Sequence, residues 1–132
     1  MAHFVGTWKL TKSDNFDAVL QKLGVNVIKR KLINSTHPEV TYTLDGENMT
    51  IKTVSALKTT TIHFQFGKEF EEKTADDRTV MSTVTKESDD KLVQIQKHPD
   101  NTTEIVREVH GDSLTSHVSV GDVKAVLQYT KK

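Results

Sequence analysis

The sequence predicts an all-β fold, an antiparallel barrel or sandwich, interrupted near the N-terminus by one helical segment. Two observations lead to this prediction. From about residue 37 onward, segments rich in Val, Ile, Thr, Phe and Tyr alternate with short turn-forming stretches, a spacing typical of sandwiches and barrels. Over residues 15–36, by contrast, apolar residues recur at helical spacing. We therefore expect one strand, a pair of helices, and then about nine further strands.

The first expected elements are a strand over about residues 5–13 and two short helices. The apolar residues that share one face of the first helix are Phe16, Val19, Leu20 and Leu23. Asp14 or Asn15 can cap its start, and Gly24 is placed to end it, because glycine tolerates the left-handed conformation that follows many helices. A second apolar set over residues 25–33 predicts the second helix. The pair has no helical layer to pack on, so it covers the sheet or closes the mouth of a barrel.

The clearest hairpin signal is the pair Asp45-Gly46, which we expect to form a two-residue turn. It lies between two β-prone segments, residues 40–44 and 49–51. Gly111-Asp112 and Gly121-Asp122 are further turn signals nearer the C-terminus. Turns this short indicate that sequential strands pair in antiparallel fashion.

The composition excludes several classes of function. Eighteen basic and eighteen acidic residues balance, so no overall field attracts nucleic acid. The absence of cysteine excludes a disulfide framework, a thiol nucleophile and a Cys-ligated zinc site. The 132 residues fit a single domain, residues 1–132. No signal peptide and no membrane-spanning stretch is visible, so we expect a cytoplasmic monomer.

Nothing in the sequence indicates an enzyme, and we expect no catalytic residue, metal ion or cofactor. The six histidines are scattered, without a pair at metal-ligand spacing. The paired carboxylates Glu71-Glu72, Asp76-Asp77 and Asp89-Asp90 lie in or near expected turns. Acidic residues are common in turns, so we interpret these pairs as solvated turn residues.

Alternation along two of the later strands places an arginine and a tyrosine on inward faces. Arg107 shares its face with Ile105 and Val109, and Tyr129 shares its face with Leu127. An inward guanidinium is costly unless something anionic meets it. Three explanations stay open for Arg107. It reaches water from near a strand end, it pairs with an internal carboxylate, or it holds the carboxylate of a ligand with the Tyr129 hydroxyl as a second donor.

Several other inward positions are polar. Ser116 alternates in phase with Leu114, and Gln94 and Gln96 alternate in phase with Leu92. A purely structural core seldom contains so many polar side chains, whereas an interior that holds water and a ligand accommodates them. This pattern favours a cavity over a filled core.

Seven motifs occur in a fixed order along essentially the whole chain. They are Phe4-Val5-Gly6-Thr7-Trp8-Lys9-Leu10, Asn15-Phe16-Asp17, Leu23-Gly24-Val25, Gly67-Lys68-Glu69-Phe70, Thr74-Ala75-Asp76-Asp77-Arg78, Ile105-Val106-Arg107-Glu108, and the segment from Gly121 to Tyr129. In this order and at this spacing they resemble the cytosolic fatty acid-binding protein family, and most closely its heart and adipocyte-like branch.

The resemblance implies a ten-stranded antiparallel up-and-down barrel closed by a helix-turn-helix lid over about residues 15–36. It also implies intracellular transport of one long-chain fatty acid in a water-filled cavity, reached between the lid and the turns at Leu57 and Ala75. Arg107 and Tyr129 match residues that hold the carboxylate in this branch. The expected ligand-binding residues are Arg107, Tyr129, Phe16, Leu20, Thr53, Leu57, Ala75, Asp76, Gln96, Ser116, Val118 and Leu127.

The chain departs from the family pattern at two positions. Leu127 stands where the branch has a second arginine, two residues before the tyrosine, and Leu57 stands where phenylalanine is common at the portal. The first change removes one charge-assisted hydrogen bond, worth about 1.5–3 kcal/mol. We therefore expect weak discrimination between fatty acids and other apolar ligands, and the alternative function is a carrier of retinoid or another hydrophobic ligand.

Four basic residues, Lys22, Lys29, Arg30 and Lys31, cluster on the expected lid. Such a cluster can contact an anionic membrane transiently while ligand is transferred. The alternative is an ordinary solvated helix face, since the cluster is small. The sequence leaves both explanations open.

Overall fold

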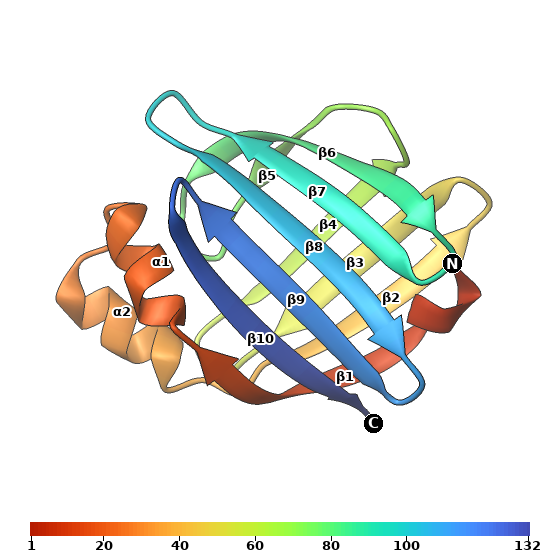
Figure 1. Ribbon diagram of the computed structural model, residues 1–132, viewed down its shortest axis with the longest axis horizontal. Coiled ribbons are helices and arrows are strands. Elements are labelled where there is room, and N and C mark those ends of the chain that lie inside the picture. The colour runs from red at the N-terminus through yellow and green to blue at the C-terminus, as the bar shows by residue number, and fades with distance from the viewer.

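The computed structural model describes residues 1–132 as a barrel of ten strands with two helices at one end (Figure 1). The helices are a short 3-10 helix η1 (Ala2–Phe4), α1 (Phe16–Lys22) and α2 (Val27–Asn34). The strands are β1 (Gly6–Asp14), β2 (Glu39–Asp45), β3 (Asn48–Val54), β4 (Thr59–Gln65), β5 (Phe70–Lys73), β6 (Thr79–Ser88), β7 (Lys91–Lys97), β8 (Thr102–His110), β9 (Ser113–Val120) and β10 (Val123–Lys131). This confirms the predicted ten-stranded barrel with a two-helix lid.

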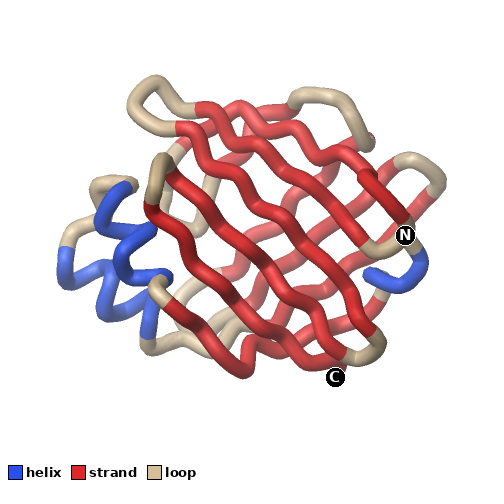
Figure 2. The backbone as a smooth tube through the Cα atoms, viewed as in Figure 1, coloured by secondary structure: helices blue, strands red, loops and turns tan.

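Each strand pairs with its neighbour in sequence, and β1 also pairs with β10, so the sheet curls round on itself (Figure 2). The exception is the gap between β4 and β5, which stand at the two ends of the hydrogen-bonded order. Aromatic side chains fill part of this gap. The rings of Phe64 on β4 and Phe70 on β5 stack with centroids 5.3 Å apart. Side-chain packing therefore replaces the backbone ladder there.

The helix pair lies over the end of the barrel formed by the close of β9 and the start of β10 (Figure 1). Val19 of α1 packs into an apolar cluster with Val118, Ala125 and Leu127. The predicted stop at Gly24 is confirmed, because this residue has φ 86° and its N–H donates to Gln21 O at 3.0 Å. Left-handed glycine here ends α1 and lets the chain turn into α2.

The prediction that a side chain of Asp14 or Asn15 caps the start of α1 is wrong. Asn15 occupies the N-cap position, yet its φ is 64° and its side chain makes no capping hydrogen bond. Its Nδ2 instead donates to Lys124 O of β10 at 2.8 Å. Asparagine tolerates this left-handed backbone, and the tertiary bond ties the start of the lid to the barrel. At α2 a cap of the usual kind is present, since Asn26 Oδ1 accepts from Lys29 N at 2.9 Å.

The predicted hairpin between β2 and β3 is present, but its turn is shifted by one residue. Asp45 pairs with Asn48 in the ladder, so the two-residue loop is Gly46-Glu47 and not Asp45-Gly46. Gly46 has φ 61°, which suits glycine at the first position of a II′ turn. Register follows from which residues pair, and a dipeptide signal alone does not determine it.

Two apolar clusters occupy opposite ends of the barrel interior. One closes the end away from the lid, where Phe4 and Trp8 are completely buried and Trp8 Nε1 donates to Phe4 O at 2.9 Å. The other lies beneath α1. None of the helices combines the length and the apolar character that crossing a bilayer requires. The space between the clusters contains the candidate site.

Candidate functional site

A cavity of about 340 Å³ lies inside the barrel and reaches the lid. It is lined by 34 residues, of which 15 are hydrophobic, and they come from the strands, from both helices and from the turns beside the lid. Its volume falls within the range of small-molecule sites, and its wall combines apolar side chains with many polar ones.

All twelve residues that the sequence singled out line this cavity. They are Phe16, Leu20, Thr53, Leu57, Ala75, Asp76, Gln96, Arg107, Ser116, Val118, Leu127 and Tyr129. The strand alternation used to choose several of them is therefore correct. Their contact with a ligand stays a prediction.

Arg107 points into the cavity from β8 and is only partly buried. Its Nη1 donates to Oε1 of Gln94 at 2.7 Å. No Asp or Glu forms an ion pair with it, and its partners in the sheet, Leu92 and Ser116, lie within neighbouring strands. Arg107 therefore makes no direct ion pair with a carboxylate and lies away from the ends of its strand, and the explanation that it holds the carboxylate of a ligand stays a prediction. A guanidinium carries five donors, so most of this one's hydrogen-bonding capacity remains free for the cavity.

Glu72 also lines the cavity, and the interpretation of Glu71-Glu72 as solvated turn residues is wrong for this member of the pair. Glu72 Oε1 accepts from Ser82 Oγ at 2.7 Å, from Gln94 Nε2 at 2.8 Å and from Gln96 Nε2 at 3.1 Å. Gln94 thus connects the two charged groups, because its Nε2 donates to Glu72 and its Oε1 accepts from Arg107. We call Glu72, Ser82, Gln94, Gln96 and Arg107 the inner polar cluster.

Two tyrosines lie beside Arg107. Burial raises the pKa of Tyr42, and the neighbouring Arg107 guanidinium opposes that rise through its charge. Burial likewise raises the pKa of Tyr129, with a further contribution from the nearby Tyr42. Both hydroxyls therefore stay protonated at neutral pH and can donate. Tyr42 was not among the predicted site residues, although Tyr42 alternates with Val40 and Leu44 on the inward face of β2.

Leu127, Ser116 and Arg107 stand in one row across three strands. Leu127 on β10 pairs with Ser116 on β9, which pairs with Arg107 on β8. Leu127 is 9% exposed and packs in the apolar cluster below α1. The position next to the arginine thus contributes apolar surface to the cavity and no second cation. Elsewhere on the wall, Thr103 Oγ1 is buried without a hydrogen-bond partner, so this hydroxyl is available to a ligand or a water molecule.

Beside the lid, one carboxylate connects three elements. Asp77, in the turn between β5 and β6, accepts from Lys29 Nζ of α2 at 2.7 Å and also pairs with Lys58 from the β3–β4 turn. Hydrogen bonds from Lys29 and Lys58 lower the pKa of Asp77 to about 2. We call these two contacts the portal ion pairs, because they join the elements between which the resemblance places the portal. Leu57 is 47% exposed in the same region.

The basic residues of the lid are not equally free. Lys29 is held by Asp77, and Arg30 donates to Asp17 Oδ1 at 3.1 Å and to Val25 O at 2.8 Å. Lys22 and Lys31 are exposed and form no ion pair. Only two of the four predicted membrane-facing cations therefore remain unpaired.

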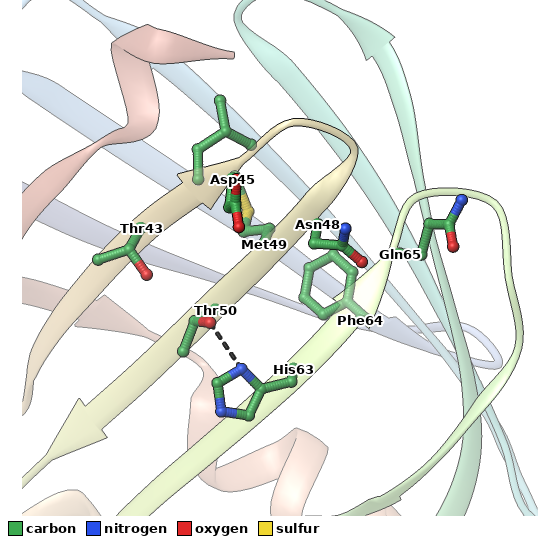
Figure 3. Close-up of a pocket in the computed structure, with 9 residues that line it drawn as sticks. Thr43, Asp45, Asn48, Met49, Thr50, His63, Phe64 and Gln65 are labelled. Atoms are coloured by element: carbon green, nitrogen blue, oxygen red, sulfur yellow. Dashed lines mark hydrogen bonds between the residues drawn. The ribbon is translucent and has the colours of Figure 1, made fainter.

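A second, open hollow lies over the hairpins of β2, β3 and β4, and its residues are drawn in Figure 3. Its best-defined contact joins Thr50 Oγ1 and His63 Nδ1 at 2.7 Å. No group of three or more potential metal ligands occurs there or elsewhere in the chain. The enclosed cavity, with its inward charges, is the stronger candidate site.

Comparisons with known proteins support this choice. The model of the lipocalin / cytosolic fatty-acid binding protein family matches residues 5–130. The chain is 66% identical to fatty acid-binding protein type 3 of Fasciola hepatica over 131 residues, which cover 99% of each chain. It is also 50% identical to the 14 kDa fatty acid-binding protein of Schistosoma mansoni, over 99% of this chain and 98% of that protein.

Among solved structures, a Schistosoma mansoni fatty acid binding protein in complex with arachidonic acid superposes with a TM-score of 0.98. It is 50% identical, and the match covers 100% of this chain and 98% of that one. The fatty-acid-binding protein 1 of Echinococcus granulosus gives a TM-score of 0.95 at 36% identity, over 99% and 98% of the two chains.

Proposed function

Because the chain belongs to the lipocalin / cytosolic fatty-acid binding protein family, we propose that it binds a long-chain fatty acid in its barrel cavity and carries it through the cytoplasm. The observation that carries this proposal is Arg107, a partly buried guanidinium that lines the cavity and makes no ion pair with a carboxylate. Because no carboxylate contacts it directly, this guanidinium keeps hydrogen-bond donors free toward the cavity, and a ligand carboxylate can accept from them.

The carboxylate is bound by Arg107 and by the hydroxyl of Tyr129 in this proposal. Charge-assisted hydrogen bonds of this kind are stronger than neutral ones. The Tyr129 phenol remains a donor because burial raises its pKa, and Tyr42 is placed to add a second phenol. Ser116 stands next to Arg107 in the β8–β9 ladder, so a water molecule bound there completes the set of donors.

The acyl chain supplies most of the binding free energy. At about 0.8 kcal/mol per methylene, fourteen methylenes contribute roughly 11 kcal/mol before the costs of association. Phe16, Leu20 and Val118 line the part of the cavity near the lid and offer this apolar contact. The tail therefore extends from the inner polar cluster toward the portal.

A neutral hydrophobic ligand, a retinoid among them, is the alternative cargo. Leu127 favours a neutral ligand, because Arg107 is the only cation in the row formed by Leu127, Ser116 and Arg107. Because the cavity offers a ligand carboxylate one arginine and not two, we expect the protein to distinguish fatty acids poorly from their alcohols or methyl esters. A calorimetric panel in which fatty acids bind a thousandfold tighter than these analogues would refute that expectation.

The chain acts as a carrier and not as an enzyme in this proposal, and it acts as a monomer. Transient contact with an anionic membrane, if the lid makes one, falls to Lys22 and Lys31, since Lys29 and Arg30 are paired within the molecule. Charge reversal at Lys22 and Lys31 should then slow transfer to anionic vesicles more than reversal at Arg30.

Two measurements test the fatty acid proposal. Mass spectrometry of the lipid that co-purifies with the protein should identify long-chain fatty acids. In displacement titrations, Arg107→Ala should weaken fatty acid binding by about 10- to 150-fold, the equivalent of one charge-assisted contact, and leave methyl ester binding nearly unchanged. Lys124→Ala, which removes an exposed cation from the outer face of β10, is the matched control. Unweakened fatty acid binding by Arg107→Ala would overturn the assignment of the anchor.

A further inference from the structure

The inner polar cluster contains one cation and one carboxylate, Arg107 and Glu72, and Gln94 connects them. The other charged or titratable side chains that line the cavity, apart from the tyrosines, are Lys12, His37, Lys58, Asp76 and Arg78. Of these, Asp76 and Arg78 pair with each other at 2.6 Å and Lys58 pairs with Asp77, whereas Lys12 and His37 are exposed. With Glu72 ionised, the formal charge of the inner polar cluster is therefore zero before any ligand arrives.

The two oxygens of Glu72 have different surroundings. Oε1 accepts all three hydrogen bonds, from Ser82, Gln94 and Gln96. Oε2 accepts none, and Glu72 lines the cavity. A proton on Oε2 would thus leave each of the three donors with its acceptor. The site can hold Glu72 in either protonation state without breaking its hydrogen bonds.

An anionic ligand disturbs this balance. A fatty acid carboxylate bound at Arg107 would bring a second negative charge into an interior with one positive charge. Like charges in a poorly solvated site repel strongly, and they raise the affinity of one carboxylate for a proton. The interior of a protein screens such a pair less than bulk solvent does.

We propose that binding of a fatty acid anion is coupled to uptake of one proton from solvent by Oε2 of Glu72. The proton adds to the free oxygen, no other bond changes, and the loaded cluster returns to a formal charge of zero. A neutral ligand adds no charge and takes up no proton. This inference rests on the proposed function, since it takes the fatty acid carboxylate to lie at Arg107.

Glu72 is hydrogen-bonded by the neutral side chains of Ser82, Gln94 and Gln96. Arg107 on β8 lies on the other side of Gln94, and Tyr42 on β2 and Tyr129 on β10 lie beside Arg107. The arginine stays charged, and burial raises the pKa of both phenols, so none of these groups titrates between about pH 6 and 8.5. Because a proton is taken up on binding, affinity for fatty acid rises as the pH falls, by about tenfold per pH unit when uptake is complete.

The test is calorimetric titration with dodecanoate and with 1-dodecanol between about pH 6 and 8.5. Each titration is made in two buffers of different ionisation enthalpy, because the difference between the two heats gives the number of protons taken up. Dodecanoate should bind with net proton uptake and dodecanol with none. Glu72→Gln should abolish the uptake and make the dodecanoate affinity independent of pH. Glu71→Gln, on the exposed face of the same strand, is the matched control and should keep the wild-type uptake.

A second variant covers the case in which Glu72→Gln does not fold. Leu127→Arg adds a cation in the same row as Ser116 and Arg107, so it should also reduce proton uptake toward zero. Dodecanoate binding without proton uptake, or uptake that persists in Glu72→Gln or in Leu127→Arg, would overturn this inference and leave the proposed function intact. If neither probe bound, the same titration would be made with hexadecanoate, and its failure to bind would refute the proposed function and the inference with it.

Discussion

The cavity has charged side chains at two places, the inner polar cluster and the portal ion pairs. In the inner polar cluster, Arg107 and Glu72 share a completely buried amide, Gln94. At the portal, Asp77 holds Lys29 and Lys58 in contacts that solvent reaches. Removing a charge from water is costly, and salt screens exposed pairs efficiently. We therefore expect the inner charges to determine which ligand binds and the portal charges to determine how quickly the ligand exchanges.

Removal of the amide at the centre of the inner cluster should have the largest effect. Gln94→Leu takes away the donor to Glu72 and the acceptor for Arg107, so both charged groups lose a hydrogen-bond partner. We expect the unfolding free energy of the ligand-free protein to fall by about 2–4 kcal/mol, measured by urea denaturation. Gln128→Leu, on the exposed face of β10, should change it by less than about 0.5 kcal/mol. Equal effects of the two variants would mean that the cluster has no special energetic role.

A second inner cation should sharpen head-group selectivity. Leu127→Arg places a guanidinium in the row of Ser116 and Arg107, where a carboxylate can accept hydrogen bonds from both arginines. The ratio of fatty acid affinity to methyl ester affinity should rise by about 10- to 100-fold. Competitive displacement of a fluorescent lipid measures this ratio directly. If the affinity ratio of Leu127→Arg equalled that of the wild type, the ligand carboxylate would not lie close to residue 127.

The ionisation of the two tyrosines measures how well the cavity interior is shielded from solvent, and this test needs no substitution. They are the protein's only tyrosines, and burial raises the pKa of both Tyr42 and Tyr129. A folded pKa above the unfolded value of about 10 gives stability that is complete below pH 10 and lost as the pH rises toward the folded pKa. An alkaline titration followed by tyrosinate absorbance should therefore show little ionisation at pH 10 while circular dichroism still reports a folded barrel. Half-ionisation at that pH in the folded state would show that the phenols are solvated.

Changes at the portal should be smaller and kinetic. Asp77→Asn releases Lys29 and Lys58, and we expect fatty acid release to accelerate about 2- to 5-fold, less so at high salt, with little change in stability. Stopped-flow transfer to vesicles measures the rate, with Asp112→Asn in the turn at the opposite end as control.

The contacts of Asp77 with Lys29 and Lys58 should depend on pH. The pKa of Asp77 is lowered to about 2 from 3.8, so its contribution is present above about pH 4 and is lost as the pH falls toward 2. Release that is insensitive both to Asp77→Asn and to acid in this range would mean that the pairs do not restrain the portal.

Local signals in the sequence were sufficient to predict an antiparallel all-β fold with a helix pair, and the family resemblance singled out the ten-stranded barrel. Turn residues recur between β-prone segments, Gly24 stops α1, and alternation places Arg107 and Tyr129 inside. Each of these depends on neighbours within a few residues. The placement of the cavity-lining residues followed from the same local periodicity together with the family resemblance.

What could not be predicted depends on contacts between distant segments. Glu72 lies on a strand of four residues, too short for alternation to distinguish it from a turn residue. Asn15 bonds β10 instead of capping its helix, and Lys29 finds Asp77 from the other side of the portal. Such pairings are set by the closed barrel and leave no periodic signal in the chain.

The most direct test is a crystal structure of the protein with a long-chain fatty acid bound. We predict a carboxylate within about 3 Å of the Arg107 guanidinium and the Tyr129 hydroxyl, with the tail running past Phe16 toward the portal. A carboxylate held at the portal by Lys29 or Lys58, with the tail filling the space beside Arg107, would contradict it.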